Sequence, residues 1–379
     1  MAIEVPLSKV MIDEDEICTI ADVFRSGWLA HGVWNEKFET IFKEKVGVNH
    51  AIAMNSCTSA LEIALLANDI RGEVIVPSMT WVATANVVLR TGGTPVFCEV
   101  DPASRNVTAD LIADQISDKT EAVIIVHFAG MPCQMDEIVD LCQQKGLLLV
   151  EDSAETLGAT WNGKQAGSFG VGCFSFFPTK NITTGEGGMF TCDDEILAQK
   201  ARTLIGHGVS KTTFEREKVE RPWIRAAKVA GHNYRMPNPL AALGYSQMVK
   251  LDAMNSRRQA IADVYNAALH GLSPHLKIPE VVSGATHVYQ MYTLRVNSEI
   301  RDEFVRSLRA SGIGASVHFD PPVHLQPCYL DLGMHEGMLP TTELLARELV
   351  TLPMYPGMSA EERDAVVSAV KGQIIKYNS

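Results

Sequence analysis

The feature that most constrains the fold of this chain is a series of short apolar runs separated by stretches with helical spacing. The apolar runs are EVIVP (73–77), TPVFCEV (94–100), EAVIIVHF (121–128) and LLLVED (147–152). The helical stretches between them are 80–91, 108–116 and 134–145. Strands that are apolar throughout and alternate with helices are typical of a parallel sheet covered by helices on both faces. The sequence therefore predicts an α/β fold with a mostly parallel sheet.

Further patterns flank this region. Before it we expect helices at 14–26 and 36–47, a strand at 51–54, and a polar turn in which Ser56 or Thr58 caps the next helix. After it we expect helices at 237–250, 251–270, 300–311, 340–350 and 359–376, and strands near 287–296 and 314–319. These patterns predict a large domain over residues 1–250 and a smaller α+β domain over residues 251–379, with the N-terminal segment able to pack on the smaller domain.

The composition is that of a soluble globular protein, with 379 residues, 46% apolar and 21% charged. No run of 18 apolar residues occurs, so we expect no membrane span, and the N-terminus lacks the pattern of a secretory signal. Eight scattered cysteines without a C-x-x-C pair favour the cytoplasm. A net charge of −12 argues against a nucleic-acid partner, because nucleic acid binds broad basic surfaces.

Two polar side chains stand where strands are expected to end. Asp152 closes the run at 147–152, and Lys180 follows the apolar run 173–177 and precedes a glycine-rich loop. Ligands of parallel α/β sheets bind beyond the carboxyl ends of the strands. Pyridoxal 5'-phosphate (PLP) needs a lysine for its Schiff base and an acid beside its pyridinium nitrogen. This pair of residues therefore points to PLP as the cofactor.

Three motifs carry a resemblance to a known family. They are EDSAETLGA (151–159), FSFFPTKNITTGEGGM (174–189) and HNYRMPNPLAALG (232–244). They resemble the sugar aminotransferases of the DegT/DnrJ/EryC1/StrS family, which are PLP enzymes of fold type I. The resemblance covers nearly the whole chain. It implies a fold type I PLP transferase.

The resemblance also implies roles for individual residues. Lys180 would hold PLP and act as the general acid and base, and Asp152 would pair with the pyridinium nitrogen. Ala154 and Trp81 would lie on the two faces of the ring. The implied phosphate contacts are Thr58, Ser59, Ser175 and Asn233. In the family that asparagine reaches the phosphate of the other subunit, which implies a homodimer with a shared active site.

Several residues near this site have open roles. Family members often carry Gln or His where Glu155 stands, near the phenolic oxygen of PLP, and some carry Glu. A carboxylate would repel a phenolate there unless the two share a proton, so the role of Glu155 is open. From the sequence alone, Trp81 is more often a buried structural residue than a cofactor contact. His127, at the end of a strand, fits a ligand contact or a satisfied core histidine equally well.

Two further stretches are candidates for substrate contact. The segment GASVHFDPPVHLQPCY carries His318, Asp320 and His324 and is similar to a substrate-proximal stretch of the family. Its histidines have no third ligand at a suitable spacing, so we expect no metal, and substrate contact and loop structure both stay open. The stretch 208–235 has an excess of four positive charges, and it includes Arg235. It could face an anionic substrate, cross to a neighbouring subunit or form a solvated loop.

The resemblance implies a transfer of an amino group, with L-glutamate as donor, to a keto-sugar in amino-sugar or lipopolysaccharide biosynthesis. The acceptor could be a nucleotide-linked 4-keto-6-deoxy sugar or a keto-octulosonate that gives 8-amino-3,8-dideoxy-octulosonate. A PLP-dependent sugar dehydratase of the same fold is an alternative, but it has histidine where Lys180 stands. A non-catalytic PLP-binding regulatory protein is the second alternative, and it would require the loss of residues that are present here.

Overall fold

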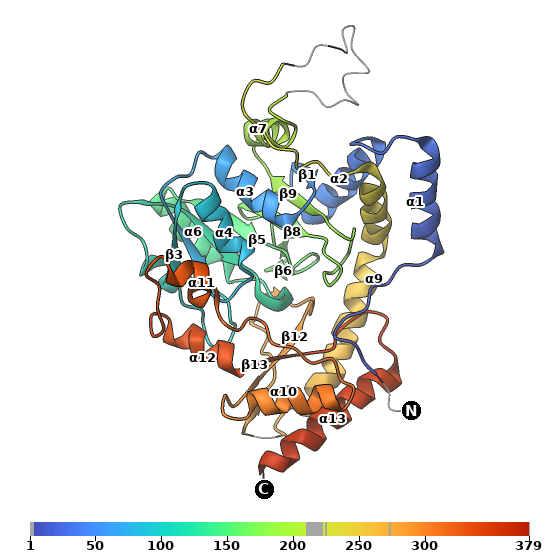
Figure 1. Cartoon of the computed structure of the whole chain (residues 1–379), viewed down its shortest axis with the longest axis vertical. Coiled ribbons are helices and arrows are strands. Elements are labelled where there is room, and N and C mark those ends of the chain that lie inside the picture. The colour runs from blue at the N-terminus through green and yellow to red at the C-terminus, as the bar shows by residue number, and fades with distance from the viewer. Residues whose placement is uncertain (1–3, 210–222, 224–225, 273, 379) are drawn as a thin grey trace.

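A seven-stranded sheet forms the centre of the larger part of the protein (Figure 1). The structure is a computed structural model that describes residues 4–209, 223, 226–272 and 274–378. In spatial order the strands are β1 (His50–Met54), β9 (Gly188–Cys192), β8 (Val171–Ser175), β5 (Leu148–Asp152), β4 (Thr120–Val126), β2 (Glu73–Pro77) and β3 (Thr94–Cys98). Only the two pairings of β9 are antiparallel among the described strands of this sheet. The predicted α/β fold with a mostly parallel sheet is confirmed.

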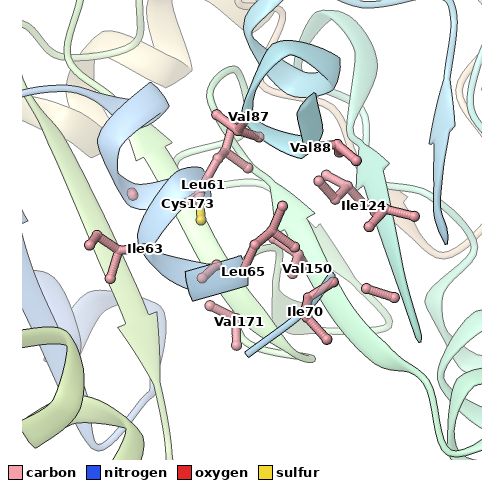
Figure 2. Packing of buried hydrophobic residues seen from close by; sticks show 14 of the residues in the cluster. Leu61, Ile63, Leu65, Ile70, Val87, Val88, Ile124, Val150, Val171 and Cys173 are labelled. Atoms are coloured by element: carbon pink, nitrogen blue, oxygen red, sulfur yellow. The ribbon is translucent and has the colours of Figure 1, made fainter. Parts of the chain in front are cut away.

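Helices cover both faces of this sheet. One face packs against α3 (Cys57–Ala67), α4 (Ala83–Arg90) and α7 (Glu195–Ile205). Figure 2 shows Leu61 and Leu65 of α3 and Val87 of α4 facing Ile124 and Val150 of the sheet. The other face packs against α2 (Val33–Val46), α5 (Ala109–Ala113) and α6 (Met135–Lys145). Burial of each large apolar side chain contributes about 1.5–3 kcal/mol, so these two layers fix the positions of the strand ends.

The long helix α9 (Asn238–Leu269) connects the two parts of the molecule (Figure 1). It is one helix of 32 residues, so the prediction of two separate helices at 237–250 and 251–270 was wrong. Its first half packs into the core that contains Phe38 and Phe42, and its second half packs into the core that contains Phe304. The predicted domain boundary at residue 250 falls inside this helix and stays a prediction.

A smaller α+β unit surrounds the second half of α9. Its antiparallel sheet has the order β10 (Leu276–Lys277), β12 (Tyr292–Val296) and β13 (Leu349–Leu352). Its helices are α10 (Arg301–Ala310) and α13 (Ala360–Asn378). The helix α12 (Pro340–Glu348) contacts β12 and also packs into a core of the large sheet. The short helix α11 (Pro327–Leu330) lies on the larger part, where Tyr329 packs against Phe97 of β3. The N-terminal segment joins the smaller unit, because Val5 lies in its core and the Val5 amide donates to the carbonyl of Gly312 at 2.9 Å.

Further predicted elements differ from the structure, and one short sheet was not predicted. The strand expected near 287–296 is shorter, because β12 begins at Tyr292. Residues 314–319 form no regular strand, because only Ser316 bridges, to Thr351. The helix predicted at 340–350 ends at Glu348, and residues 349–352 form β13. The extra sheet consists of β6 (Thr160–Trp161), β7 (Lys164–Gln165) and β11 (Ala285–Thr286). The helix α1 (Glu14–Ser26), predicted with the same bounds, lies against α9.

Candidate active site

Lys180 lies in the loop that follows β8, as the sequence predicted. The loop turns back at once, because the Lys180 amide donates to the carbonyl of Phe177 at 2.9 Å. The Lys180 ammonium is 3.0 Å from Oε1 of Glu155, and the lysine side chain is only 17% exposed. Strand β8 pairs in parallel with β5, which ends at Asp152. The structure therefore brings Lys180 to the edge of the sheet where Asp152 lies.

Glu155 joins Lys180 to the end of β4. Its second oxygen, Oε2, accepts the amide of Ala129 at 2.7 Å. Ala129 has a φ of +59° in the turn that follows β4, and this conformation aims its N–H at the carboxylate. Both oxygens of Glu155 are thus held by donors of the protein. In this chain Glu155 therefore has two defined partners, the Lys180 side chain and the Ala129 amide. The sequence alone left its role open.

Asp152 is buried at the end of β5. Its Oδ2 accepts the hydroxyl of Thr84 at 2.8 Å, and its Oδ1 accepts the amide of Ala154 at 3.2 Å. The Thr84 hydroxyl is itself 2.8 Å from that of Thr80, which acts as the donor because Thr84 gives its own proton to Asp152. Burial raises the pKa of Asp152, and these hydrogen bonds and Lys180 oppose the rise. Among the described residues no cation lies at hydrogen-bond distance from Asp152, and such a buried carboxylate fits a partner that brings an N–H.

The beginning of α3 forms a corner with β8 and β9. Ser56 is the cap of α3, since its hydroxyl accepts the amide of Ser59 at 3.1 Å, and Thr58 lies half-buried in the first turn. Gly188 pairs with Ser175 of β8, and a Cβ on it would lie 2.3 Å from the backbone of Ser56. The structure thus brings Ser59, Thr58 and Ser175 together at a helix N-terminus, a place that favours phosphate.

Asn233 and Arg235 run beside the end of β1. Met54 bridges Arg235, and the amide of Asn55 donates to the carbonyl of Tyr234 at 2.8 Å. Asn233 is exposed, and its Oδ1 accepts from the guanidinium of Arg235 at 3.1 Å. Part of the predicted basic stretch lies outside the described residues, namely Lys211, Glu215, Arg216, Glu217, Lys218, Glu220, Arg221 and Arg225.

Trp81 presents an exposed indole ring near the site. It is 63% exposed, so the interpretation as a buried structural tryptophan was wrong. Its ring centroid lies 6.1 Å from that of Phe319, at an interplanar angle of 48°. Phe319 was not predicted, because it reaches Trp81 from a segment more than 200 residues later in the chain. Ala154 is half-buried directly after the end of β5.

The three histidines have different environments. His318 donates to or accepts from the hydroxyl of Thr351 at 2.8 Å; burial lowers its pKa, and the charges of Glu155 and Lys180 act on it in opposite directions. His324 is fully buried, with Nδ1 2.7 Å from the Ser78 hydroxyl and Nε2 3.2 Å from Glu343, so its geometry favours a structural role over the predicted substrate contact.

His127 is a satisfied core residue. Its Nδ1 accepts the amide of Cys133 at 3.0 Å, so its Nε2 carries the proton and donates to Glu151 at 3.1 Å.

Among the described residues, no group of three or more His, Cys, Asp or Glu could hold a metal ion. No helix in the described part of the chain is long and apolar enough to cross a membrane.

The comparisons with known proteins decide the family. The model of the DegT/DnrJ/EryC1/StrS aminotransferase family matches residues 10–371. The chain belongs to this family. It is 38% identical over 375 residues to the spore coat polysaccharide biosynthesis protein SpsC of Bacillus subtilis, which covers 97% of this chain and 96% of SpsC.

Solved structures agree with this assignment. The aminotransferase TlmJ from Streptoalloteichus hindustanus has a TM-score of 0.92 and 31% identity, over 99% of this chain and 100% of TlmJ. The protein Spr1654 from Streptococcus pneumoniae, in its PLP form, has a TM-score of 0.92 and 26% identity, over 99% of each chain. The family implies a sugar aminotransferase with a fold type I architecture and PLP as cofactor. The residues of this chain fit that cofactor, since a lysine, a buried carboxylate and a helix N-terminus converge at one sheet edge.

Proposed function

We propose that this sugar aminotransferase holds PLP through Lys180 and transfers an amino group from L-glutamate to the carbonyl of a keto-sugar. The observation that carries the proposal is the position of two residues at the carboxyl ends of adjacent parallel strands. Asp152 is the last residue of β5, and Lys180 lies in the loop after β8. When bound, PLP supplies the electron sink for the transfer of the amino group.

The residues of the chain would share the remaining tasks. Lys180, once free of Glu155, would take a proton from the substrate carbon and return it, because a neutral amine is a base and an ammonium is an acid. Asp152 would accept the N–H of the cofactor ring, and Trp81 and Ala154 would cover its two faces. Thr58, Ser59 and Ser175 would donate to the phosphate at the beginning of α3.

We further propose a homodimer in the cytoplasm, with Asn233 of one subunit completing the phosphate site of the other. The position of Asn233 on the exposed surface beside β1 supports this arrangement. His318 and Arg235 are proposed substrate contacts, and the electrostatic coupling of His318 to Lys180 and Glu155 supports the first. A dilution series tests the dimer, because full PLP occupancy in monomers would refute a shared site.

The proposed acceptor is a nucleotide-linked sugar, such as a GDP-, dTDP- or UDP-linked 4-keto-6-deoxy sugar, or a keto-octulosonate that gives 8-amino-3,8-dideoxy-octulosonate. The name of SpsC supports an amino sugar destined for a surface polysaccharide, with lipopolysaccharide as one such product. Both acceptors carry negative charge, and the basic stretch at 208–235 supports an anionic acceptor.

An absorption spectrum of the PLP-loaded protein tests the proposal. We expect L-glutamate to remove the visible band, and the correct keto-sugar from a panel of both classes to restore it. A visible band that L-glutamate leaves unchanged would instead indicate a non-catalytic PLP-binding protein.

A further inference from the structure

Two buried threonines connect the turn after β2 to Asp152. Thr80 lies in this turn and is 3% exposed, and Thr84 lies in the first turn of α4 and is fully buried. The hydroxyl oxygens of the two threonines are 2.8 Å apart, and that of Thr84 is 2.8 Å from Oδ2 of Asp152. We call these two residues the threonine pair. They stand behind the carboxylate that is proposed above to contact the cofactor.

The direction of these hydrogen bonds depends on the protonation state of Asp152. An ionised carboxylate only accepts hydrogen bonds, so Thr84 must donate its proton to Oδ2. The Thr84 oxygen then has only lone pairs to offer, which makes Thr80 the donor to Thr84. Hydrogen bonds to an ionised acceptor are about twice as strong as those between neutral groups, and a donor that itself accepts a hydrogen bond is strengthened further. The threonine pair therefore stabilises the ionised form of Asp152.

The other groups at hydrogen-bond distance from Asp152 are also neutral. Its Oδ1 accepts the amide of Ala154 at 3.2 Å and lies 3.9 Å from Sγ of Cys57 on α3. Burial raises the pKa of the thiols of Cys57 and of Cys173 on β8. Both thiols are therefore protonated and uncharged at neutral pH. The described protein thus holds the carboxylate with neutral donors and leaves its charge for a cationic ligand.

The charged neighbours of Asp152 act in opposite directions. Lys180 lowers the pKa of Asp152 and Glu155 raises it, and these two residues form an ion pair with each other at 3.0 Å. On the adjacent strand β4, His127 directs its Nε2 at Glu151 instead. After burial, the hydrogen bond from Thr84 has the largest effect on the pKa of Asp152, and it lowers that pKa.

We propose that Thr84, supported by Thr80, is a positioning residue that keeps Asp152 ionised, so that the proton between them stays on the ring nitrogen of the cofactor. This inference rests on the proposed function, because it takes Asp152 as the partner of that nitrogen. A protonated ring is the better electron sink. Without the Thr84 hydroxyl, Asp152 would hold a proton itself over a wider range of pH.

The stability of the cofactor-free protein gives the first test. Thr84→Val replaces the hydroxyl with a methyl group of similar size, and the loss of a hydrogen bond to a charged group should raise the pKa of Asp152 by about one to two units. A raised pKa destabilises the folded protein only where Asp152 is ionised. The stability difference between wild type and Thr84→Val should therefore grow as the pH rises through the folded pKa of wild type. It should become constant above the folded pKa of the variant. Urea unfolding from about pH 4 to about pH 9 measures this difference.

Binding of pyridoxamine 5'-phosphate gives the second test. This probe has the ring of the cofactor but no aldehyde, so it forms no covalent bond with Lys180. Its apparent dissociation constant rises as the fraction of protein with an ionised Asp152 falls. At a pH below the folded pKa of Asp152 in both proteins, Thr84→Val should bind about 10- to 100-fold more weakly than wild type. The ratio should fall towards one as the pH rises.

Three further variants separate this effect from damage to the fold. Thr84→Ser keeps the hydroxyl and should restore the wild-type profiles. Thr80→Val acts only through Thr84 and should give a smaller shift in the same direction. Thr91→Val is the matched control, because Thr91 is a buried threonine at the end of the same helix whose hydroxyl donates to the carbonyls of Val87 and Val88. Its effect on stability should not change with pH, and its affinity for the probe should equal that of wild type.

The proposal is overturned if the stability difference for Thr84→Val is the same at every pH, or if Thr84→Ser behaves like Thr84→Val. A ratio of dissociation constants that does not change with pH would also overturn it. If Thr84→Val does not fold, the smaller shift of Thr80→Val decides the matter by the same two measurements. If wild type does not bind pyridoxamine 5'-phosphate, the proposed function fails, whereas the urea profiles still show whether Thr84 keeps Asp152 ionised.

Discussion

The Nζ of Lys180 lies 3.0 Å from Oε1 of Glu155, while Oε2 of Glu155 accepts the amide of Ala129 at 2.7 Å. The carboxylate is therefore fixed by the backbone after β4, and it holds Nζ of Lys180 at one position. Nζ must leave this ion pair before it can attack a carbonyl. The ion pair thus keeps Lys180 in place and also restrains its reactivity.

Glu155→Gln should speed the uptake of PLP at pH 7. The variant replaces the ion pair between Lys180 and residue 155 with a weaker neutral contact, so Nζ leaves this position more readily to reach the aldehyde of PLP. An ion-pair energy of about 1 kcal/mol corresponds to an increase of about fivefold in the initial rate. Stopped-flow measurement of the visible absorbance tests this, with Glu186→Gln, an exposed change in the same loop, as the control. Slower uptake by Glu155→Gln than by wild type would contradict this account.

Asp152→Asn should change the stability of the cofactor-free protein and its affinity for PLP in opposite directions. Because burial raises the pKa of Asp152, its contribution to stability is present below the pKa of an unfolded aspartate and is lost as the pH rises through the folded value. At pH 8 the variant should therefore make the cofactor-free protein more stable and weaken PLP binding. Urea unfolding and a PLP titration measure the two effects, with the exposed Asp118→Asn as control. A loss of stability in the cofactor-free variant would argue against this description of Asp152.

Trp81→Ala and Trp161→Ala should give opposite results. Trp81 is exposed, so its loss should change the free energy of unfolding of the cofactor-free protein by less than about 1 kcal/mol and weaken PLP binding about tenfold. Trp161 is buried and donates to Asp136 at 3.0 Å, so its loss should cost about 3–5 kcal/mol. Chemical denaturation and PLP titration of both variants test the contrast. Equal PLP affinity of Trp81→Ala and wild type would remove Trp81 from the site.

His287 should make the protein less stable as the pH falls. It stacks on Tyr289 at a centroid distance of 3.9 Å, and burial lowers its pKa to about 3. Below about pH 6.5 the unfolded chain holds a proton that the folded protein does not, so the free energy of unfolding decreases by about 1.4 kcal/mol per pH unit. His287→Asn should remove about 1.4 kcal/mol of the loss between pH 7.5 and 5.5, and the exposed His270→Asn should not. Parallel pH profiles for His287→Asn and wild type would show that the pKa of His287 is the same in the folded and unfolded states, which would contradict the effect of burial.

The sheet and the positions of Lys180 and Asp152 could be predicted because they depend on local signals. Apolar runs of five to eight residues indicate buried strands, and the polar residues that follow them fall at one edge of a parallel sheet. The capping role of Ser56 is equally local, since the amide that it accepts is only three residues away.

Other features depend on contacts between distant parts of the chain. Buried His324 lies at hydrogen-bond distance from Ser78, which is 246 positions earlier in the chain. No spacing within the sequence predicts that contact. The continuity of α9 was missed because its two halves pack into different hydrophobic cores. The pattern of buried residues therefore differs between the two halves. The partner of Glu155 was missed because it is a backbone amide, which leaves no side-chain signal.

The most direct test is borohydride reduction of the protein after incubation with PLP, followed by peptide mass spectrometry. The account predicts a yellow protein whose coenzyme becomes fixed to Lys180, and a colourless Lys180→Arg variant. A protein that stays colourless, or a label that falls on another lysine, would contradict it.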